Sequence, residues 1–365
     1  MTRRVDYLDG IRALAIGGVL AAHWVAQYLP LGHGGHLGVD VFFVLSGFVI
    51  TTVMWRSRDT GSTGALYRSF LWRRVKRLYP ALLGLVVVSP IAVALVPGSP
   101  LSVTAAAERA GLATIQATWI AEALGHTTDP FRQTWSLAIE WYFYLLWPIV
   151  VFALKARGVA PLKLAKGAAL AAALIYVASL PMSGRWFYVT PPARFAEILA
   201  GAVLALVMVA RPDLTWGWAK GWLAALALGG ISVYVVVSPW HYTEPPLRWI
   251  GIPLAVSGTL VLIAHGYSHR PSAVTRLLTW APMTLVGRAS YSLYLWHWLP
   301  LYLLDKDSIP LPVPVLAVLG VGLAAAFTTA SYVFLEKPFM SSRAGALQPR
   351  DVPAPSSSPT NASSH

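Results

Sequence analysis

Residues 14–29 read LAIGGVLAAHWVAQYL, an apolar stretch that contains the titratable imidazole of His23. With its flanks it predicts a helix over residues 10–30, which at a rise of about 1.5 Å per residue would cross the roughly 30 Å hydrocarbon core of a bilayer. An ionisable side chain within a membrane span is costly and by default marks a functional site. The stretch therefore predicts a membrane protein with chemistry at His23.

The composition extends this interpretation to the whole chain. Hydrophobic residues make up 56% of the 365 residues and charged residues 12%, against roughly 25% charged in a soluble domain. The predicted fold is an all-α integral membrane protein with about ten transmembrane helices. We expect them at residues 10–30, 37–54, 78–97, 136–154, 165–181, 191–210, 217–238, 248–266, 285–304 and 313–335.

The stretch 103–124 differs from these spans. It carries Glu108, Arg109 and Glu122, and its apolar residues are mostly alanine. We expect a helix that lies in or near the membrane interface.

The distribution of Lys and Arg predicts the orientation. Of the 28 basic residues, 21 fall on the side that holds the N-terminus and 6 on the opposite side. This bias places both termini in the cytoplasm. We expect a multi-pass protein of the cytoplasmic (inner) membrane, and the high Ala, Gly, Val and Leu content with a preference for Arg over Lys fits a bacterium. The net charge of +13 then reflects topology and attraction to anionic lipid of the bilayer, and predicts no nucleic-acid partner.

Two segments make up the predicted domain organisation: a membrane domain over residues 1–340 and a disordered, Pro/Ser-rich cytoplasmic tail over 341–365. No small-residue cleavage site follows the N-terminal residues, so we expect an uncleaved anchor. The chain has no cysteine, which excludes disulfides, a thiol nucleophile and thiolate metal sites.

Polar residues recur at one depth in the outer half of the expected spans. Their shared depth suggests that they face one another around a single polar cavity. They are His23, Asp40, Glu140, Arg194, Glu197 and His297.

Within this layer, His23 and Asp40 lie on consecutive antiparallel helices, so the carboxylate could orient the imidazole as a general base. A structural role is the alternative for each polar residue: an interhelical hydrogen bond for His23, Glu140 or His297, and a plain i,i+3 salt bridge for Arg194 and Glu197. Tyr294 is first of all a packing or interfacial residue.

The segment His33-Gly34-Gly35-His36 has two imidazoles but reads as a flexible surface loop without a third ligand, so we predict no metal site.

A dense basic string, RRVKRLYP, occupies residues 73–80. Positive-inside bias explains its charge but not its spacing. Arg74 and Arg77 are three residues apart in an expected helix, and Arg73 and Lys76 repeat that spacing. Two guanidiniums on one helical face suit bidentate phosphate contacts.

These segments, taken in order, resemble the acyltransferase-3 family of integral membrane O-acyltransferases. The resemblance covers residues 6–338. Its segments are YLDGIRALAI (7–16) followed by His23, GVDVFFVLSGF (38–48), RRVKRLYP (73–80), WSLAIEWYFY (135–144), RFAE (194–197), YSLYLWH (291–297) and LEKP (335–338).

The resemblance implies ten spans and transfer of an acyl group, most often acetyl, from cytoplasmic acyl-CoA to a hydroxyl of a glycan or lipid-linked sugar. It implies that His23 is the essential histidine and that the motif of Arg74 and Arg77 contacts the donor. It leaves Asp40 and Glu140 as site carboxylates. Some relatives carry an extracytoplasmic esterase-like domain, and here we expect any such partner to be a separate protein.

The hypothesis that combines both lines of argument assigns catalysis to His23, Asp40 and Glu140, and donor binding to Arg73, Arg74, Lys76 and Arg77. Arg194, Glu197, Tyr294 and His297 are candidates for the acceptor cavity. Acyl-CoA acts as a co-substrate, and no cofactor is bound permanently. His23 lies roughly 20 Å above the cytoplasmic edge by helix rise, which requires either a deep cavity or an acyl-enzyme relay.

Two alternatives remain open. The acceptor could be a small glycosylated secondary metabolite instead of a surface glycan. Intramembrane His, Asp and Glu could also form the proton relay of a transporter, although a carrier needs no phosphate clamp.

Overall fold

The computed structural model describes residues 2–57, 61–95, 101–211, 218–268, 270–305 and 309–339, with side chains from residue 6 onward. The predicted tail at 341–365 lies outside these ranges. Within them the chain folds into helices and forms no strand. The first half comprises α1 (Thr2–Leu20), η1 (Ala21–Val25), η2 (His33–His36), α2 (Leu37–Arg56), α3 (Thr63–Leu95), α4 (Val103–Thr114), α5 (Thr118–Ala123) and α6 (Thr134–Ala156).

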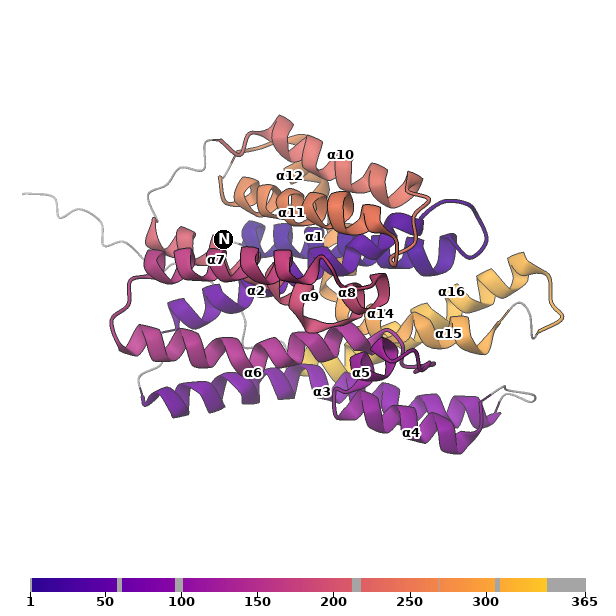
Figure 1. Cartoon of the computed structure of the whole chain (residues 1–365). Helices are drawn as coiled ribbons and strands as arrows, with labels where there is room; N and C mark the ends of the chain where they lie inside the picture. Colours follow the sequence, from indigo (N-terminus) through magenta and orange to yellow (C-terminus); the bar gives the residue numbers. More distant parts are fainter. Residues whose placement is uncertain are drawn as a thin grey trace, which may run out of the picture.

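The second half continues the bundle shown in Figure 1. It comprises α7 (Pro161–Ser179), α8 (Gly184–Val189), α9 (Pro191–Ala210), α10 (Gly221–Val237), η3 (Leu247–Gly251), α11 (Ile252–Tyr267), α12 (Ala273–Leu278), α13 (Ala281–Arg288), α14 (Ser290–Trp296), α15 (Trp298–Leu303), α16 (Val313–Ala330), η4 (Ser331–Glu336) and η5 (Lys337–Phe339).

Eight helical segments within the described ranges are long and apolar enough to cross a membrane. They match eight of the ten expected spans. The span expected at 217–238 is the 17-residue helix α10. The span expected at 285–304 is instead three short helices, because the chain is broken between α13, α14 and α15.

The stretch 103–124 forms two helices, α4 and α5, where one was expected. The chain breaks between them at Gln116, whose φ of 60° is incompatible with a continuous right-handed helix. Helix α4 packs against α3.

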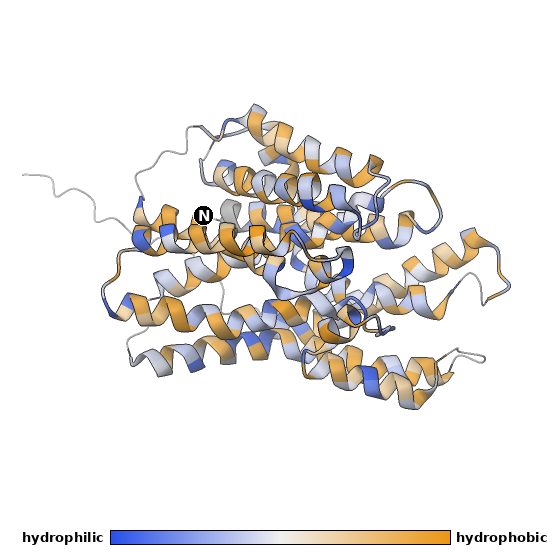
Figure 2. Cartoon of the chain, viewed as in Figure 1, coloured by the Kyte–Doolittle hydropathy of each residue, from blue (hydrophilic) through white to orange (hydrophobic). Residues whose placement is uncertain are grey.

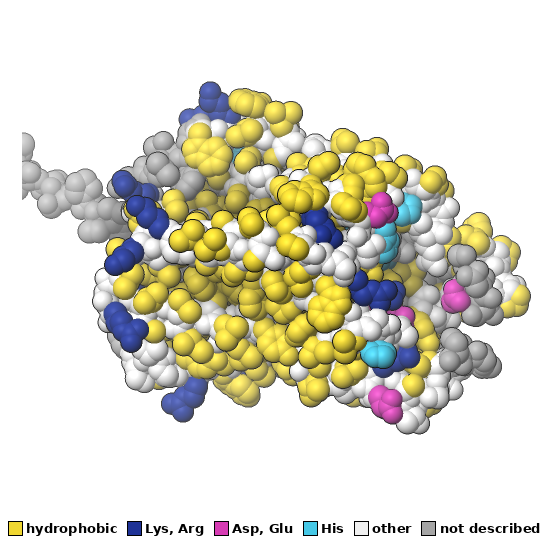
Figure 3. Space-filling view, viewed as in Figure 1, with side chains coloured by type: hydrophobic (Ala, Val, Ile, Leu, Met, Phe, Trp, Pro, Cys, Tyr) yellow, Lys and Arg dark blue, Asp and Glu magenta, His cyan; other side chains and the backbone are white. Residues whose placement is uncertain are grey.

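Many large apolar side chains are exposed on the outside of the bundle, and Figure 2 shows hydrophobic residues along most of its helices. On α3, Leu83, Val87 and Ile91 are exposed, and other helices repeat this pattern. Lys and Arg gather at the end of the bundle that carries the N-terminus, whereas Asp, Glu and His gather towards the opposite end (Figure 3). We call these the basic end and the acidic end.

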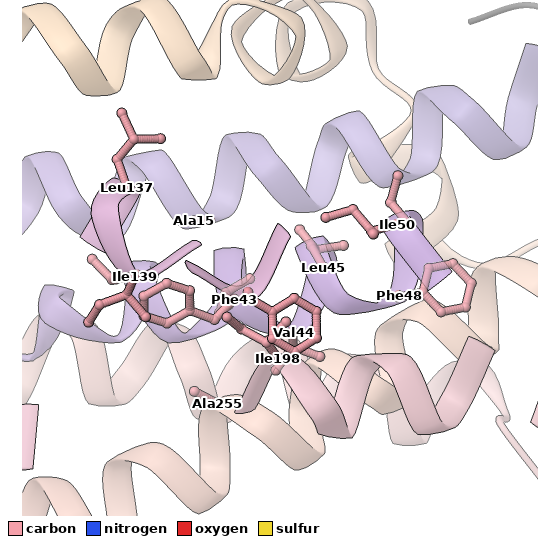
Figure 4. Packing of buried hydrophobic residues seen from close by; sticks show 14 of the residues in the cluster. Ala15, Phe43, Val44, Leu45, Phe48, Ile50, Leu137, Ile139, Ile198 and Ala255 are labelled. Carbon is pink, nitrogen blue, oxygen red and sulfur yellow. The ribbon is translucent and has the colours of Figure 1, made fainter. Parts of the chain in front are cut away.

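Helix α2 lies at the centre of the bundle, and most of its side chains are buried. It packs most closely against α9, where a Cβ on Gly47 would lie 1.8 Å from the Ile198 carbonyl oxygen, so only glycine allows this approach. Figure 4 shows Phe43 and Val44 of α2 close to Ile198 of α9. A hydrophobic helix that is buried all round is typical of the core of a large bundle.

Candidate active site

A first cavity, of about 120 Å³, lies between α1, α2, α3, α6 and α14. Three guanidiniums line it, those of Arg12, Arg74 and Arg77. We call it the basic cavity.

The string at 73–80 lies inside α3, as its spacing predicted. Arg74 and Arg77 line the basic cavity together, and Arg74 lies over the Tyr144 ring at 5.5 Å. Arg73 and Lys76 are exposed instead: Arg73 donates to the Ser69 hydroxyl (2.6 Å), and Lys76 lies over the Trp72 ring at 5.7 Å. Helical periodicity therefore separates the four cations into a cavity pair and a surface pair.

Arg12 was not predicted as a site residue. It pairs with Asp9, one turn earlier on α1, and Asp9 in turn lies 3.5 Å from Arg288. The sequence offers one signal for it: Arg12 is a lone cation at the start of an expected span, and it lies three residues after Asp9, which places both side chains on one helix face.

Glu140 also lines the basic cavity, together with Ser46 and Tyr144. The Tyr144 hydroxyl is 3.2 Å from the Ser46 hydroxyl. Glu140 therefore shares a cavity with the cations of α3 and is not part of the lining that contains His23.

A second cavity, of about 510 Å³, lies towards the acidic end and is lined by His23, His33, His36 and His241. Aromatic rings of Trp135, Tyr188, Tyr242 and Trp298 complete much of its wall. We call it the histidine cavity.

His23 lies in the π-helical turn η1, a rare local geometry that is frequent at functional sites. Its partner is His297, whose Nε2 is 3.0 Å from His23 Nδ1. His297 Nδ1 is 2.8 Å from the Tyr294 carbonyl oxygen, which can only accept, so Nδ1 carries the proton. In the neutral pair, His297 Nε2 then accepts from His23 Nδ1–H, which leaves His23 Nε2 as the basic nitrogen.

The expected contact between Asp40 and His23 is replaced by a different one. Asp40 is completely buried and pairs with Arg194, whose second amino group lies 2.9 Å from Glu197. These three side chains line neither cavity. The single polar layer expected from the sequence is therefore divided into two cavities and one buried ion cluster, because each helix has its own rotation about its axis.

The expectation of a flexible surface loop at 33–36 is wrong. These residues form the 3₁₀-helix η2, and a Cβ on Gly35 would lie 2.0 Å from the Gly18 carbonyl oxygen. This close packing brings the His36 ring to 5.8 Å from the His23 ring and 5.8 Å from the His241 ring. Burial lowers the pKa of His241 below its usual range, which favours the neutral imidazole.

Arg132 is a further residue that the sequence did not single out. It lines the histidine cavity and lies over the Trp298 ring at 5.9 Å, on the same indole that the His23 ring contacts at 4.7 Å. Burial acts to lower the pKa of Arg132, but the carboxylates of Asp129 and Glu122 outweigh it and raise the pKa.

Helix α14 connects the two cavities. Tyr291 lines the basic cavity, Tyr294 lines both cavities, and His297 follows as the C-terminal neighbour of the helix. The spacing of three residues makes each of these side chains a neighbour of the one before it, over about 9 Å along the helix. The other residue shared by the two linings is Val39.

Comparison with known proteins gives a match to the model of the acyltransferase domain family (Acyl_transf_3) over residues 5–335. The chain is 28% identical to O-acetyltransferase OatA of Staphylococcus aureus (strain NCTC 8325 / PS 47), over 92% of this chain and 57% of OatA. It is 28% identical to "Putative peptidoglycan O-acetyltransferase YrhL" of Bacillus subtilis (strain 168), over 92% of this chain and 55% of YrhL. The chain thus spans little more than half the length of these relatives. No solved structure gives a significant match.

Proposed function

Because this chain belongs to the acyltransferase-3 family, we propose that it is a membrane O-acyltransferase that moves an acyl group, normally acetyl, from acyl-CoA to a hydroxyl of a glycan. One observation carries the proposal: a cavity lined by arginines and a cavity lined by histidines meet at Val39 and Tyr294. The first suits a phosphorylated donor, and the second suits a polyhydroxylated acceptor.

The basic cavity supports the donor assignment through charge and unmet hydrogen bonding. Arg12, Arg74 and Arg77 place three cations around about 120 Å³. The Arg77 Nε is buried and has no hydrogen-bond partner among the described residues. Guanidiniums bind phosphate through two parallel N–H donors, and a buried donor without a partner is costly until a ligand satisfies it.

The histidine pair supports a general-base mechanism. His23 Nε2 takes the proton of the acceptor hydroxyl as its oxygen attacks the thioester carbonyl. The new C–O bond forms, the C–S bond breaks, and the proton passes from His23 to the departing sulfur to give free CoA. His297 Nε2 holds the Nδ1–H of the resulting imidazolium, the role that a carboxylate plays in a catalytic triad.

The shared lining of the two cavities supports direct transfer over an acyl-enzyme relay. Tyr291 and His297 are separated by about 9 Å of helix, which the flexible arm of CoA can cover. The sequence alone suggested that the acyl group must travel farther, because the distance to His23 was counted from the cytoplasmic edge of the membrane and not from the basic cavity.

The acceptor is proposed from the aromatic wall of the histidine cavity. Trp135, Tyr188, Tyr242 and Trp298 offer apolar ring faces next to polar groups such as Gln133. A mixture of ring faces and a few polar groups is typical of small-molecule sites and suits a sugar ring. YrhL is named for peptidoglycan, so peptidoglycan fragments are the first acceptors to test.

The test measures acetyl-CoA binding and CoA release by the purified protein in detergent. We expect His23→Ala to bind acetyl-CoA but to lose release, by about 10²–10⁴-fold, since that is the usual contribution of a general base. The double variant Arg74→Ala/Arg77→Ala should lose binding.

The matched control is Arg73→Ala/Lys76→Ala, which removes the same two charges from the same helix but from its exposed side. It should bind acetyl-CoA as wild type does. If both double variants lose acetyl-CoA binding equally, the effect of the arginines is one of net charge and not of a binding site in the cavity. A wild-type protein that neither binds nor cleaves any acyl-CoA would overturn the proposal and favour a transporter.

A further inference from the structure

Val39 and Tyr294 are the two residues that line both cavities. Val39 belongs to α2 and Tyr294 to α14. If the donor thioester enters from the basic cavity and the base lies beside the histidine cavity, these two shared side chains flank the route of the acyl group. We call this place the passage.

The Tyr294 side of the passage is held by hydrogen bonds. The Tyr294 hydroxyl lies 2.9 Å from the Gln133 carbonyl oxygen and 2.6 Å from the Ser136 hydroxyl. The carbonyl can only accept, so Tyr294 donates to it and accepts from Ser136. The Phe42 ring lies edge-on to the Tyr294 ring, with centroids 6.2 Å apart. The ring therefore has little freedom to move away from the passage.

The Val39 side is held by the packing of α2. Val39 is 6% exposed and precedes Asp40, which is tied to Arg194 of α9. Helix α2 also contacts α1, α6 and α11. With one wall fixed by hydrogen bonds and the other by a central helix, the width of the passage depends on the side chains themselves.

We propose that the passage between Val39 and Tyr294 selects the length of the acyl group, admitting acetyl and excluding longer chains. This inference rests on the proposed function and adds the substrate class of its donor. An acetyl group carries only a methyl group on its carbonyl carbon. A butyryl group is longer by two methylenes, and these would have to lie against the Val39 side chain. In a closed apolar site, one additional methylene on the substrate changes the ratio of kcat/KM between the two substrates by about 10–200-fold.

The test compares kcat/KM for acetyl-, propionyl-, butyryl- and hexanoyl-CoA. Val39→Ala removes two methyl groups from the passage, so we expect the ratio of butyryl to acetyl turnover to rise by at least about 10-fold. The control is Val41→Ala, which removes the same atoms from a buried position on the same helix that lines neither cavity. It should leave the ratio within about two-fold of wild type, since it does not touch the passage.

Tyr294→Phe provides a second variant, because it keeps the ring but removes both hydrogen bonds. It should also raise the turnover of the longer donors relative to acetyl-CoA, because the ring keeps its size but is no longer held in place by hydrogen bonds. Retained acetyl-CoA turnover in Val39→Ala shows that the variant is folded.

The outcomes separate the two proposals. If wild type turns over acetyl-CoA and the ratio in Val39→Ala equals that of wild type, the passage does not select the acyl group, although the proposed function stands. Equal turnover of hexanoyl- and acetyl-CoA by wild type also overturns the selection. No turnover or binding of any donor by wild type overturns the proposed function and this inference with it.

Discussion

His23 shows how a residue's chemistry depends on a partner that local sequence does not indicate. Its Nδ1 is tied to His297, and His297 is tied to the Tyr294 carbonyl, so two successive hydrogen bonds define which nitrogen of His23 is basic. A histidine can replace the expected carboxylate in this chain because a neutral imidazole presents one acceptor. The partner is neutral, and it therefore stabilises the imidazolium less than a carboxylate would.

At this scale we predict that His297→Leu lowers kcat by about 10²-fold or more, because His23 loses its orientation and tautomer control. The KM for acetyl-CoA should change little, since His297 does not line the basic cavity. The measurement is steady-state kinetics across acetyl-CoA concentrations. His297→Gln, whose carbonyl oxygen is an acceptor, should recover part of the loss; equal loss in both variants would contradict the orienting role.

At the scale of the element, α2 and α9 act as one unit. Gly47 allows their backbones to touch, and a buried cation on α9 lies between two carboxylates. Arg194 is completely buried and also lies over the Tyr188 ring at 5.0 Å, next to the histidine cavity. The ion cluster thus supports the wall of that cavity without lining it.

We predict that Arg194→Leu destabilises the protein by about 3–5 kcal/mol, because it leaves the carboxylates of Asp40 and Glu197 buried without their shared cation. Asp40→Asn should be milder, since Arg194 keeps one carboxylate partner. Thermal unfolding in detergent measures the difference. If Asp40→Asn instead keeps its stability and loses CoA release as His23→Ala does, Asp40 acts in catalysis, as the sequence suggested.

At the scale of the whole molecule, the basic cavity and the histidine cavity follow the charge asymmetry of the bundle. Lys and Arg gather at the basic end, and Asp, Glu and His gather towards the acidic end (Figure 3). By the positive-inside rule the basic end is expected to face the cytoplasm, where acyl-CoA is made. The proposed reaction would then use a donor from one side of the membrane and an acceptor from the other.

The absence of native cysteine makes this orientation directly testable. Gly64→Cys adds a thiol at the exposed start of α3, where a Cβ meets nothing within 4 Å, and His126→Cys adds one in an exposed loop before α6. A membrane-impermeant maleimide should label His126→Cys in intact cells and Gly64→Cys only after permeabilisation. The reverse labelling pattern would show the opposite topology, and the basic cavity could then not take its donor from the cytoplasm.

The sequence by itself determined the helical membrane fold and the pairing of Arg74 with Arg77. Both are local properties: hydrophobicity summed over one span, and the 3.6-residue period within one helix. It did not determine that 285–304 breaks into three helices, which places Tyr294 where the two cavities meet and His297 beside His23.

Only the tertiary structure decided which polar side chains within the membrane spans pair with each other. His23 meets His297 across 274 residues, and Asp40 meets Arg194 across 154, although equal depth made other pairings equally plausible. The reason is that depth along a span follows from residue count, whereas the direction of a side chain around the helix axis is fixed only when helices such as α2 and α9 pack.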